Sequence, residues 1–326
     1  MVMALQLGMP LYRKFTLSTL LLDPSISSAN VGDQIIQESV LRGLDGLLEV
    51  SGSLPTQRRL SAAERRTART SKLAIVGGTN LLSSNMPWYQ QWKVGPLTAP
   101  LLRNKVILMG VGWWQYQAEP NAYTSWLLNQ VLSKDHVHSV RDEYTMERLQ
   151  KMGFNVLNTA CPTMWHLSTM SASPARSETC IVTLTDYNKN VEEDQWLLDE
   201  VSKYYKRVVV WPQAVRDAAY AKQLNGAFEL ITPDLNAYDK LLISTDADYI
   251  GTRLHGGIRA FQRGHWGLIV AVDNRALEIG RDTMLPVHAR GQRDEIAESI
   301  KRRASRSISL PTNAINEWKS QFSRPS

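Results

Sequence analysis

The sequence has few of the residues that cross-link a protein or anchor it in a membrane. It contains two cysteines in 326 residues, and Cys161 and Cys180 can neither build a disulfide framework nor match a metal-ligand spacing. No stretch approaches the roughly 18 apolar residues that a membrane span requires. Residues 1–14 lack an apolar run followed by a small-residue cleavage site. We therefore expect a chain without signal peptide or membrane span, in the reducing cytoplasm.

Histidine is also scarce. Of six histidines only His136 and His138 are close together, and they would alternate along one strand without a third partner. A catalytic zinc site uses three protein ligands. This scarcity argues against a metal hydrolase, and we expect no metal site.

Positive charge is concentrated in one segment. The net charge is +6, and residues 58–72 alone carry +5, because six basic side chains stand against Glu64: Arg58, Arg59, Arg65, Arg66, Arg69 and Lys72. One interpretation is a solvated surface helix or loop. The other is contact with an anionic partner, such as a lipid-linked sugar diphosphate or the inner face of the membrane that bears it. No nucleic-acid-binding motif accompanies the charge, so we expect no nucleic acid partner.

Short apolar runs alternate with longer amphipathic ones, as in βαβ units. In the first half, strands are predicted at 16–22, 73–76, 106–111, 137–140 and 154–157, with helices at 31–44 and 142–152. In the second, strands are predicted at 180–184, 208–211, 228–231, 248–251 and 268–272, with helices at 193–205, 238–244, 257–262 and 312–322. Between the halves the sequence is rich in Ser, Pro, Ala and Thr, a composition that is typical of a linker.

The predicted fold class is therefore α/β, with two Rossmann-like doubly wound domains facing a cleft. We place the first domain at 1–166, a linker at 167–178, the second domain at 179–310 and a C-terminal helix at 311–326. Ligands of such folds bind at strand carboxyl ends. The arrangement resembles the GT-B fold of many glycosyltransferases.

Two motifs of the first half stand at strand-to-helix junctions. In Asn-Val-Gly-Asp, Asn30 or Asp33 could cap the helix and Gly32 could permit the turn. The second motif is Gly-Gly-Thr-Asn, whose paired glycines would let backbone N–H groups approach an anion at a helix start. It comprises Gly77, Gly78, Thr79 and Asn80.

Two further motifs contain arginines. Arg141 leaves an apolar strand before the acids Asp142 and Glu143, and it is directed either at a ligand or at a structural salt bridge with Asp142. Arg253 and His255 flank Leu254, so an extended backbone would point both to one side. The glycines after them would allow close approach and start a helix, and Arg275 follows the next strand. We expect a functional site here, which also includes Gly256 and Gly257.

In this order and spacing, the four motifs resemble the polysaccharide pyruvyltransferase family, from about residue 16 to 281. The resemblance implies a GT-B-like fold, phosphoenolpyruvate as donor, no metal or other cofactor, and a pyruvate ketal and phosphate as products. It places His255 and Arg275 near the donor. The sequence has Ala-Cys-Pro-Thr at 160–163, where many relatives have Gly-Asp-Pro. If that acid acts on the acceptor, another group must replace it, for which we nominate Asp33.

The expected reaction moves a pyruvyl group to a sugar of an exopolysaccharide or cell-surface glycan precursor, carried on a nucleotide or lipid. His255 is the candidate acid, although nearby positive charge would lower its pKa and favour a base. Arg253 and Arg275 would clamp the donor, with Arg141 a further contact and Asp33 a base or acceptor ligand. Cys161 is expected to be a buried thiol.

Two alternatives remain at this stage. A nucleotide-sugar glycosyltransferase would share the fold and would need an acid at the ribose, for which Glu278 is the nearest candidate. A non-catalytic family member could serve as a scaffold in polysaccharide assembly. Aromatic residues of the first half could stack on an acceptor sugar or belong to the core. They are Trp88, Trp92, Trp113, Trp114 and Tyr116.

Overall fold

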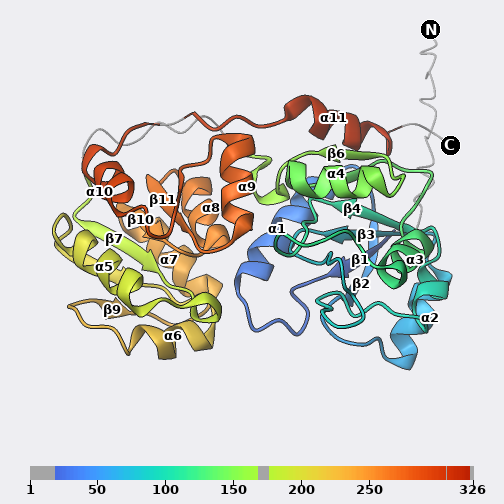
Figure 1. The fold of residues 1–326 in the computed structure, drawn as a ribbon, viewed down its shortest axis with the longest axis horizontal. Helices are drawn as coiled ribbons and strands as arrows, with labels where there is room; N and C mark the ends of the chain where they lie inside the picture. The colour runs from blue at the N-terminus through green and yellow to red at the C-terminus, as the bar shows by residue number, and fades with distance from the viewer. Residues whose placement is uncertain (1–18, 168–175, 306, 324–326) are drawn as a thin grey trace, which may run out of the picture.

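The computed structural model describes residues 19–167, 176–305 and 307–323. Two groups of parallel strands with helices packed around them lie side by side in Figure 1. The first uses chain up to η2 (Pro162–Met164), and the second begins at β7 (Thr179–Thr183). The predicted linker centre, 168–175, lies outside the described residues. No helix in the described parts is long and apolar enough to cross a membrane.

The first half has a parallel sheet of order β2-β1-β3-β4. A single bridge between Val111 and Val140 links its edge to the β5-β6 pair. The order changes direction between β1 and β3, which makes their carboxyl ends a binding position. The strands are β1 (Thr19–Asp23), β2 (Val50–Pro55), β3 (Leu73–Gly77), β4 (Val106–Met109), β5 (His138–Val140) and β6 (Val156–Asn158). The helices are α1 (Gly32–Leu44), α2 (Ala62–Thr70), α3 (Ala122–Val131) and α4 (Glu143–Lys151), with the 3₁₀ turn η1 (Ala99–Leu102).

The second half has a parallel sheet of order β12-β11-β10-β7-β8-β9. This is the strand order of dinucleotide-binding folds, and it reverses between β7 and β10. Besides β7, the strands are β8 (Arg207–Val210), β9 (Glu229–Leu230), β10 (Ala247–Gly251), β11 (Gly267–Ala271) and β12 (Val287–Ala289). The helices are α5 (Val191–Ser202), α6 (Val215–Ala221), α7 (Leu235–Ser244), α8 (Leu254–Gln262), α9 (Asn274–Thr283), α10 (Arg293–Arg302) and α11 (Thr312–Ser320), with η3 (Asp186–Asn188) after β7.

Local sequence accounts for most of these elements. Every residue of β1, β3, β7, β10 and β11 is buried, as expected of apolar strands covered on both faces. Side-chain caps start many of the helices: Asp142 accepts from Thr145 N at 2.8 Å, and Asp234 accepts from Ala237 N at 2.8 Å. The predicted class, two Rossmann-like halves facing a cleft, is confirmed.

The junction between the halves is apolar. One buried cluster unites Val31 and Ile35 of the α1 region and Cys161 of the first half with Trp211 and Ile258 of the second. At its edge, Val31 N donates to Gln213 O at 2.9 Å. Such packing restricts relative motion of the halves.

The C-terminal helix α11 returns to the first half. Figure 1 shows it beside β6, far from the α10 helix that precedes it. Its Ile315 and Trp318 are buried with Ile36 and Trp165 in a first-half cluster. The side chain of Gln321 exchanges hydrogen bonds with the backbone of Val137, at 2.9 and 3.0 Å. The predicted helix at 312–322 therefore forms and completes a core more than 150 residues before it.

Candidate active site

A cavity of about 870 Å³ opens between the two halves. Its lining comes from the loops after β1, β2, β3 and β4 on one side, and after β7, β8, β10 and β11 on the other. In both sheets the point where the strand order changes direction therefore faces the same space, which is where such folds bind ligands. We call this space the cleft. It includes the predicted site residues Asn30, Asp33, Thr79, Asn80, Arg253 and Arg275.

Arg253 lines the cleft and forms an ion pair with Asp217. Its Nε donates to Asp217 Oδ2 at 2.9 Å, and its Nη2 lies 2.5 Å from Asp217 Oδ1. Both side chains are buried, at 8% and 0% exposure. The guanidinium lies over the ring of Tyr187, 5.0 Å from its centroid. Only Nη1 has no hydrogen bond within the described residues, so Arg253 offers a ligand one nitrogen rather than a two-pronged clamp.

Arg275 is paired in a similar way but is more accessible. Its Nε donates to Asp273 Oδ2 at 2.9 Å and its Nη2 donates to the Tyr187 hydroxyl, which in turn donates to Asp273 at 3.0 Å. Although burial alone would raise it, the Arg275 guanidinium holds the pKa of Asp273 at about 2. The Arg275 side chain is 21% exposed, so a ligand reaching it competes with a fully ionised carboxylate.

Arg216 is a cleft cation that sequence reasoning missed. It lies in α6, is exposed, and has no carboxylate within salt-bridge distance in the described parts of the chain. Asp217 and Tyr187 were missed as well. All three follow the buried strands β7 and β8, so their position at strand carboxyl ends was the signal that could have identified them.

Arg141 lies behind the cleft wall. It is fully buried, its Nε lies 3.2 Å from Asp142 Oδ2, and its Nη2 donates to Asn80 Oδ1. The salt bridge that the sequence left open therefore forms. Its Nη1 is buried without a hydrogen-bond partner. Arg141 contributes positive charge to the site without lining it.

His255 does not share the direction of Arg253. The helix α8 begins at Leu254 rather than at Gly257, so the predicted extended backbone at 253–255 is wrong. Arg253 turns to Asp217, whereas His255 Nε2 faces Cys161 Sγ at 3.8 Å. Cys161 is buried, as predicted, and burial raises the pKa of its thiol.

Burial, reinforced by the charges of Arg275 and Arg141, lowers the pKa of His255 to about 3. The imidazole is therefore neutral at working pH, the base-like alternative that the sequence allowed. We expect ¹⁵N chemical shifts of His255 to report a neutral ring at pH 5, where an ordinary histidine is charged. A His255 resonance that titrates between pH 6 and 7 would contradict this. His138, whose pKa burial lowers to about 4, is the internal control.

The same shift links folding to pH. The folded pKa of His255 lies below its unfolded value of 6.5, so its contribution to stability is present above pH 6.5 and is lost as pH falls towards 3.

Asp33 belongs to the first half and lies across the cleft from the arginines of the second half. Its Oδ2 accepts from Ser28 Oγ at 2.5 Å and from Gln57 Nε2 at 2.9 Å, while Oδ1 has no hydrogen bond within the described residues. Burial raises the pKa of Asp33, against the opposing effects of those hydrogen bonds and of the Arg275 and Arg253 charges. The result is a carboxyl that retains its proton to higher pH than usual.

Asn30 has a structural role. Its Oδ1 accepts from Gly32 N at 3.1 Å, as a turn requires, and from Gln213 Nε2 of the second half at 2.8 Å. It therefore fixes the turn that carries Asp33 and ties it to the opposite half.

The paired glycines are explained by packing. A Cβ on Gly77 would lie 2.4 Å from Val40, and a Cβ on Gly78, whose φ is +59°, would lie 2.1 Å from Ile36. The Gly78 N–H donates to Met109 O at 2.8 Å. The described residues that directly follow Asn80 form no helix, and the next helical turn is η1. The expected anion cradle is therefore wrong: these glycines let α1 lie close to β3.

The second glycine pair acts likewise. A Cβ on Gly257 would lie 2.7 Å from Ile269, and one on Gly256 3.2 Å from Trp211. Neither glycine lines the cleft; both allow α8 to pack on its sheet.

The aromatic candidates separate into four groups. Trp92 and Trp113 are core residues at 3% and 0% exposure, while Trp88 is 86% exposed. Tyr116 donates a hydrogen bond to Glu278 across the junction of the halves. Glu278, the acid nominated for the glycosyltransferase alternative, therefore already has a hydrogen-bond partner. Trp114 lines the cleft.

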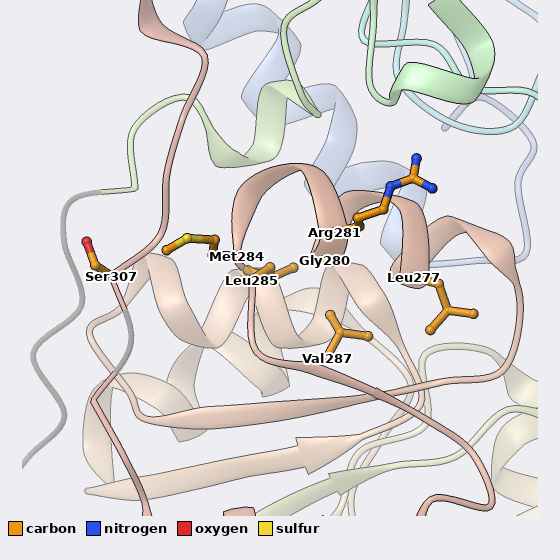
Figure 2. Close-up of a pocket in the computed structure, with 7 residues that line it drawn as sticks. All are labelled: Leu277, Gly280, Arg281, Met284, Leu285, Val287 and Ser307. Atoms are coloured by element: carbon orange, nitrogen blue, oxygen red, sulfur yellow. The ribbon is translucent and has the colours of Figure 1, made fainter. Parts of the chain in front are cut away.

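A second hollow, of about 560 Å³, lies against α9 and β12 (Figure 2). Leu277, Met284, Leu285 and Val287 form most of its wall, and the guanidinium of Arg281 points away from it. Among the described residues that line it there is no carboxylate, histidine or cysteine, and its polar side chains are Arg281 and Ser307, so we place the chemistry in the cleft.

Comparison with known proteins gives neighbours in fold. No curated protein matches the chain. A putative UDP-N-acetylglucosamine 2-epimerase from Listeria monocytogenes superposes with a TM-score of 0.50 at 11% identity, covering 95% of this chain and 98% of that one. The glycosyltransferase SnogD from Streptomyces nogalater gives a TM-score of 0.43 at 14% identity, covering 95% of each. These likenesses concern the fold alone.

The family comparison covers the cleft itself. The model of the polysaccharide pyruvyl transferase family matches residues 30–274, from the Asn-Val-Gly-Asp turn to the start of α9. The chain therefore belongs to the polysaccharide pyruvyl transferase family, and it is a transferase.

Proposed function

We propose that the cleft transfers a pyruvyl group from phosphoenolpyruvate to a sugar of an exopolysaccharide or cell-surface glycan precursor. A pyruvate ketal forms and phosphate is released. The observation that carries the proposal is the opposition, across one cleft, of a carboxyl with a raised pKa, Asp33, and three arginines on the other wall, Arg216, Arg253 and Arg275. We also propose that the domains divide at 166 and 179, with the donor on the second.

Electrostatics indicates which arginines hold the donor. Arg253 and Arg275 are neutralised by Asp217 and Asp273, so among the described residues that line the cleft Arg216 is the cation without a carboxylate partner. A phosphate or carboxylate of the donor would bind Arg216 first and then replace Asp273 on Arg275, while Arg253 adds its single free nitrogen. The buried charge of Arg141 favours the same anion.

We expect Arg216→Ala to raise the KM for phosphoenolpyruvate by about ten- to a hundred-and-fiftyfold, since a hydrogen bond to a charged group contributes about 1.5–3 kcal/mol. Because Arg216 is exposed and unpaired, the melting temperature should not change. Steady-state kinetics with varied donor and a thermal scan check both. An unchanged KM would remove Arg216 from the donor site.

The proton transfers can be assigned to Asp33. Protonated Asp33 gives a proton to the vinyl carbon, and a sugar hydroxyl attacks the neighbouring carbon as its proton passes to the Asp33 carboxylate. The second hydroxyl then attacks the same carbon, the bond to the phosphate oxygen breaks, and phosphate leaves with the last proton. The neutral, buried His255 does not line the cleft and lies 3.8 Å from Cys161 Sγ, so we propose a structural role for it.

The test is phosphate release from phosphoenolpyruvate in the presence of extracted bacterial saccharide precursors. We expect acceptor-dependent release that collapses in Arg275→Ala and in His255→Ala. Transfer from a nucleotide sugar instead would establish the glycosyltransferase alternative. Donor binding without turnover in any acceptor pool would establish a non-catalytic scaffold.

The basic segment suggests where the acceptor is held. Its six cations are all exposed, and four lie on or beside α2. Within the described parts of the chain Arg58 alone of the six has an ion pair, with Glu64 at 2.6 Å. The segment directly follows Gln57, which lines the cleft. We propose that it contacts an anionic membrane surface at the inner face of the membrane, in line with a lipid-linked acceptor.

Vesicle sedimentation tests this contact. We expect binding to phosphatidylglycerol vesicles at 50 mM salt, loss of binding at 500 mM, and none to phosphatidylcholine. Replacing Arg65, Arg66 and Arg69 with glutamine should weaken partitioning by roughly a hundredfold, at about 1 kcal/mol per basic residue. Equal binding by the triple variant would assign the segment to ordinary solvation.

A further inference from the structure

The cleft wall opposite the arginines carries a pair of stacked aromatic rings. Tyr89 and Trp114 lie with their ring centroids 3.5 Å apart and their planes at 16°. They belong to separate loops, after β3 and β4, and both line the cleft. Tyr89 is 36% exposed and Trp114 is half-buried, so the pair presents aromatic surface to the cleft instead of being enclosed in the core.

The pair is held in place by the core beneath it. Trp114 N donates to Leu82 O at 2.7 Å, and Leu82 N donates to Gly112 O at 3.3 Å, which joins the two loops. The neighbouring Trp113 is fully buried, with its Nε1 donating to Gln117 Oε1 at 3.1 Å. A rigid aromatic surface of this kind binds without a large loss of conformational freedom.

Amide groups surround the rings. Gln91 and Gln115 line the cleft beside them, and Gln91 Nε2 lies 3.4 Å from the Tyr89 hydroxyl. Gln115 has a left-handed backbone, with φ of 56°, and no hydrogen bond of its side chain is found in the described residues. Amides can both donate to and accept from hydroxyl groups.

This wall also lacks positive charge. Among the described residues of the first half that line the cleft there is no lysine or arginine, and the one ionisable acid is Asp33. A diphosphate would find no cation there. A neutral ring with an apolar face and hydroxyl edges fits the combination of flat aromatic surface and amides.

We propose that Tyr89 and Trp114 form the subsite for an uncharged pyranose ring of the acceptor, with the amides of Gln91 and Gln115 binding its hydroxyls. The proposal rests on the cleft being the transferase site described above. It excludes a sugar diphosphate from this wall, so any charged carrier must lie away from these two rings.

Saturation-transfer NMR with methyl β-D-galactopyranoside and methyl β-D-glucopyranoside tests the subsite without donor or turnover. We expect the wild type to bind at least one glycoside at millimolar concentration, and Trp114→Ala to weaken binding at least tenfold. Trp114→Phe, which keeps a ring, should retain most of the affinity. Trp88→Ala is the matched control, since Trp88 is 86% exposed and does not line the cleft.

Binding of phosphoenolpyruvate, measured by calorimetry, separates this inference from the proposed function. It should be equal in wild type and Trp114→Ala. Glycoside binding that is absent from the wild type, or unchanged in Trp114→Ala, overturns the subsite. Glycoside binding that depends on Trp114 supports the subsite even if phosphoenolpyruvate does not bind, and that result would reject the donor instead.

Discussion

An Asp33→Asn enzyme is expected to turn over about a hundred to ten thousand times more slowly than the wild type while folding more stably at neutral pH. The loss follows from removal of the group that moves protons, whose contribution is typically of that size. The gain follows from burial, which raises the pKa of Asp33 and makes its ionised form costly in the folded state.

The sign of the pH dependence is fixed by the same shift. Because the folded pKa lies above the unfolded one, the stability contributed by Asp33 is fully present below its unfolded pKa and is lost as pH rises through its folded pKa. The two proteins should therefore unfold at similar urea concentrations at pH 3.5, and the variant at higher urea at pH 7.5. His255 and His138 are unchanged between them, so their acid effects cancel in the comparison.

Two outcomes would contradict this assignment. Full activity in Asp33→Asn would show that another group moves the protons. A variant less stable than the wild type at pH 7.5 would show that the hydrogen bonds from Ser28 and Gln57 outweigh the burial of the charge. Either result would leave Asp33 with a structural role, as the acceptor of the hydrogen bonds from Ser28 and Gln57.

Asp217→Ala is expected to lower the free energy of unfolding by about 3–5 kcal/mol, because it leaves the Arg253 charge buried and unpaired. Asp217 also accepts from the backbone N–H groups of Asp186 at 3.0 Å and Ala214 at 3.1 Å, so two loops at the cleft lose an anchor. Chemical unfolding measures the loss.

The adjacent Arg216→Ala is the matched control, since it changes a charge on the same helix turn without a buried partner. A double variant, Asp217→Ala with Arg253→Met, should recover much of the stability, because it removes the orphaned charge. If Asp217→Ala instead unfolds at the same denaturant concentration as the wild type, Arg253 is hydrated in the folded protein. It would then be free to bind the donor, as the sequence alone suggested.

The pattern of apolar runs predicted most of the strands. Strands such as β3 and β11 are continuous and buried, so their sequences carry the signal by themselves. The strand β2, with the sequence Val-Ser-Gly-Ser-Leu-Pro, was missed because it lies at the sheet edge and four of its six residues are not buried. Its position depends on pairing with β1, which a local pattern does not reveal.

The site was predicted in part, for a similar reason. Position at strand ends brought Asp33, Arg253 and Arg275 to one cleft. The ion pair of Arg253 with Asp217 joins residues 36 positions apart and follows from the strand order, so it could not be read from either motif. The glycines were misassigned because close packing and anion binding select the same residue.

The return of α11 to the first half has a consequence for how the protein is made. Ribosomes add roughly 5–20 residues per second, so the first half waits on the order of ten to thirty seconds between its own emergence and that of Trp318. During that interval the apolar seat that Ile36 and Trp165 provide for this helix is open to solvent. A nascent chain halted after α10 would carry a complete second half and an unfinished first half. The earlier-made half is thus the later to be completed.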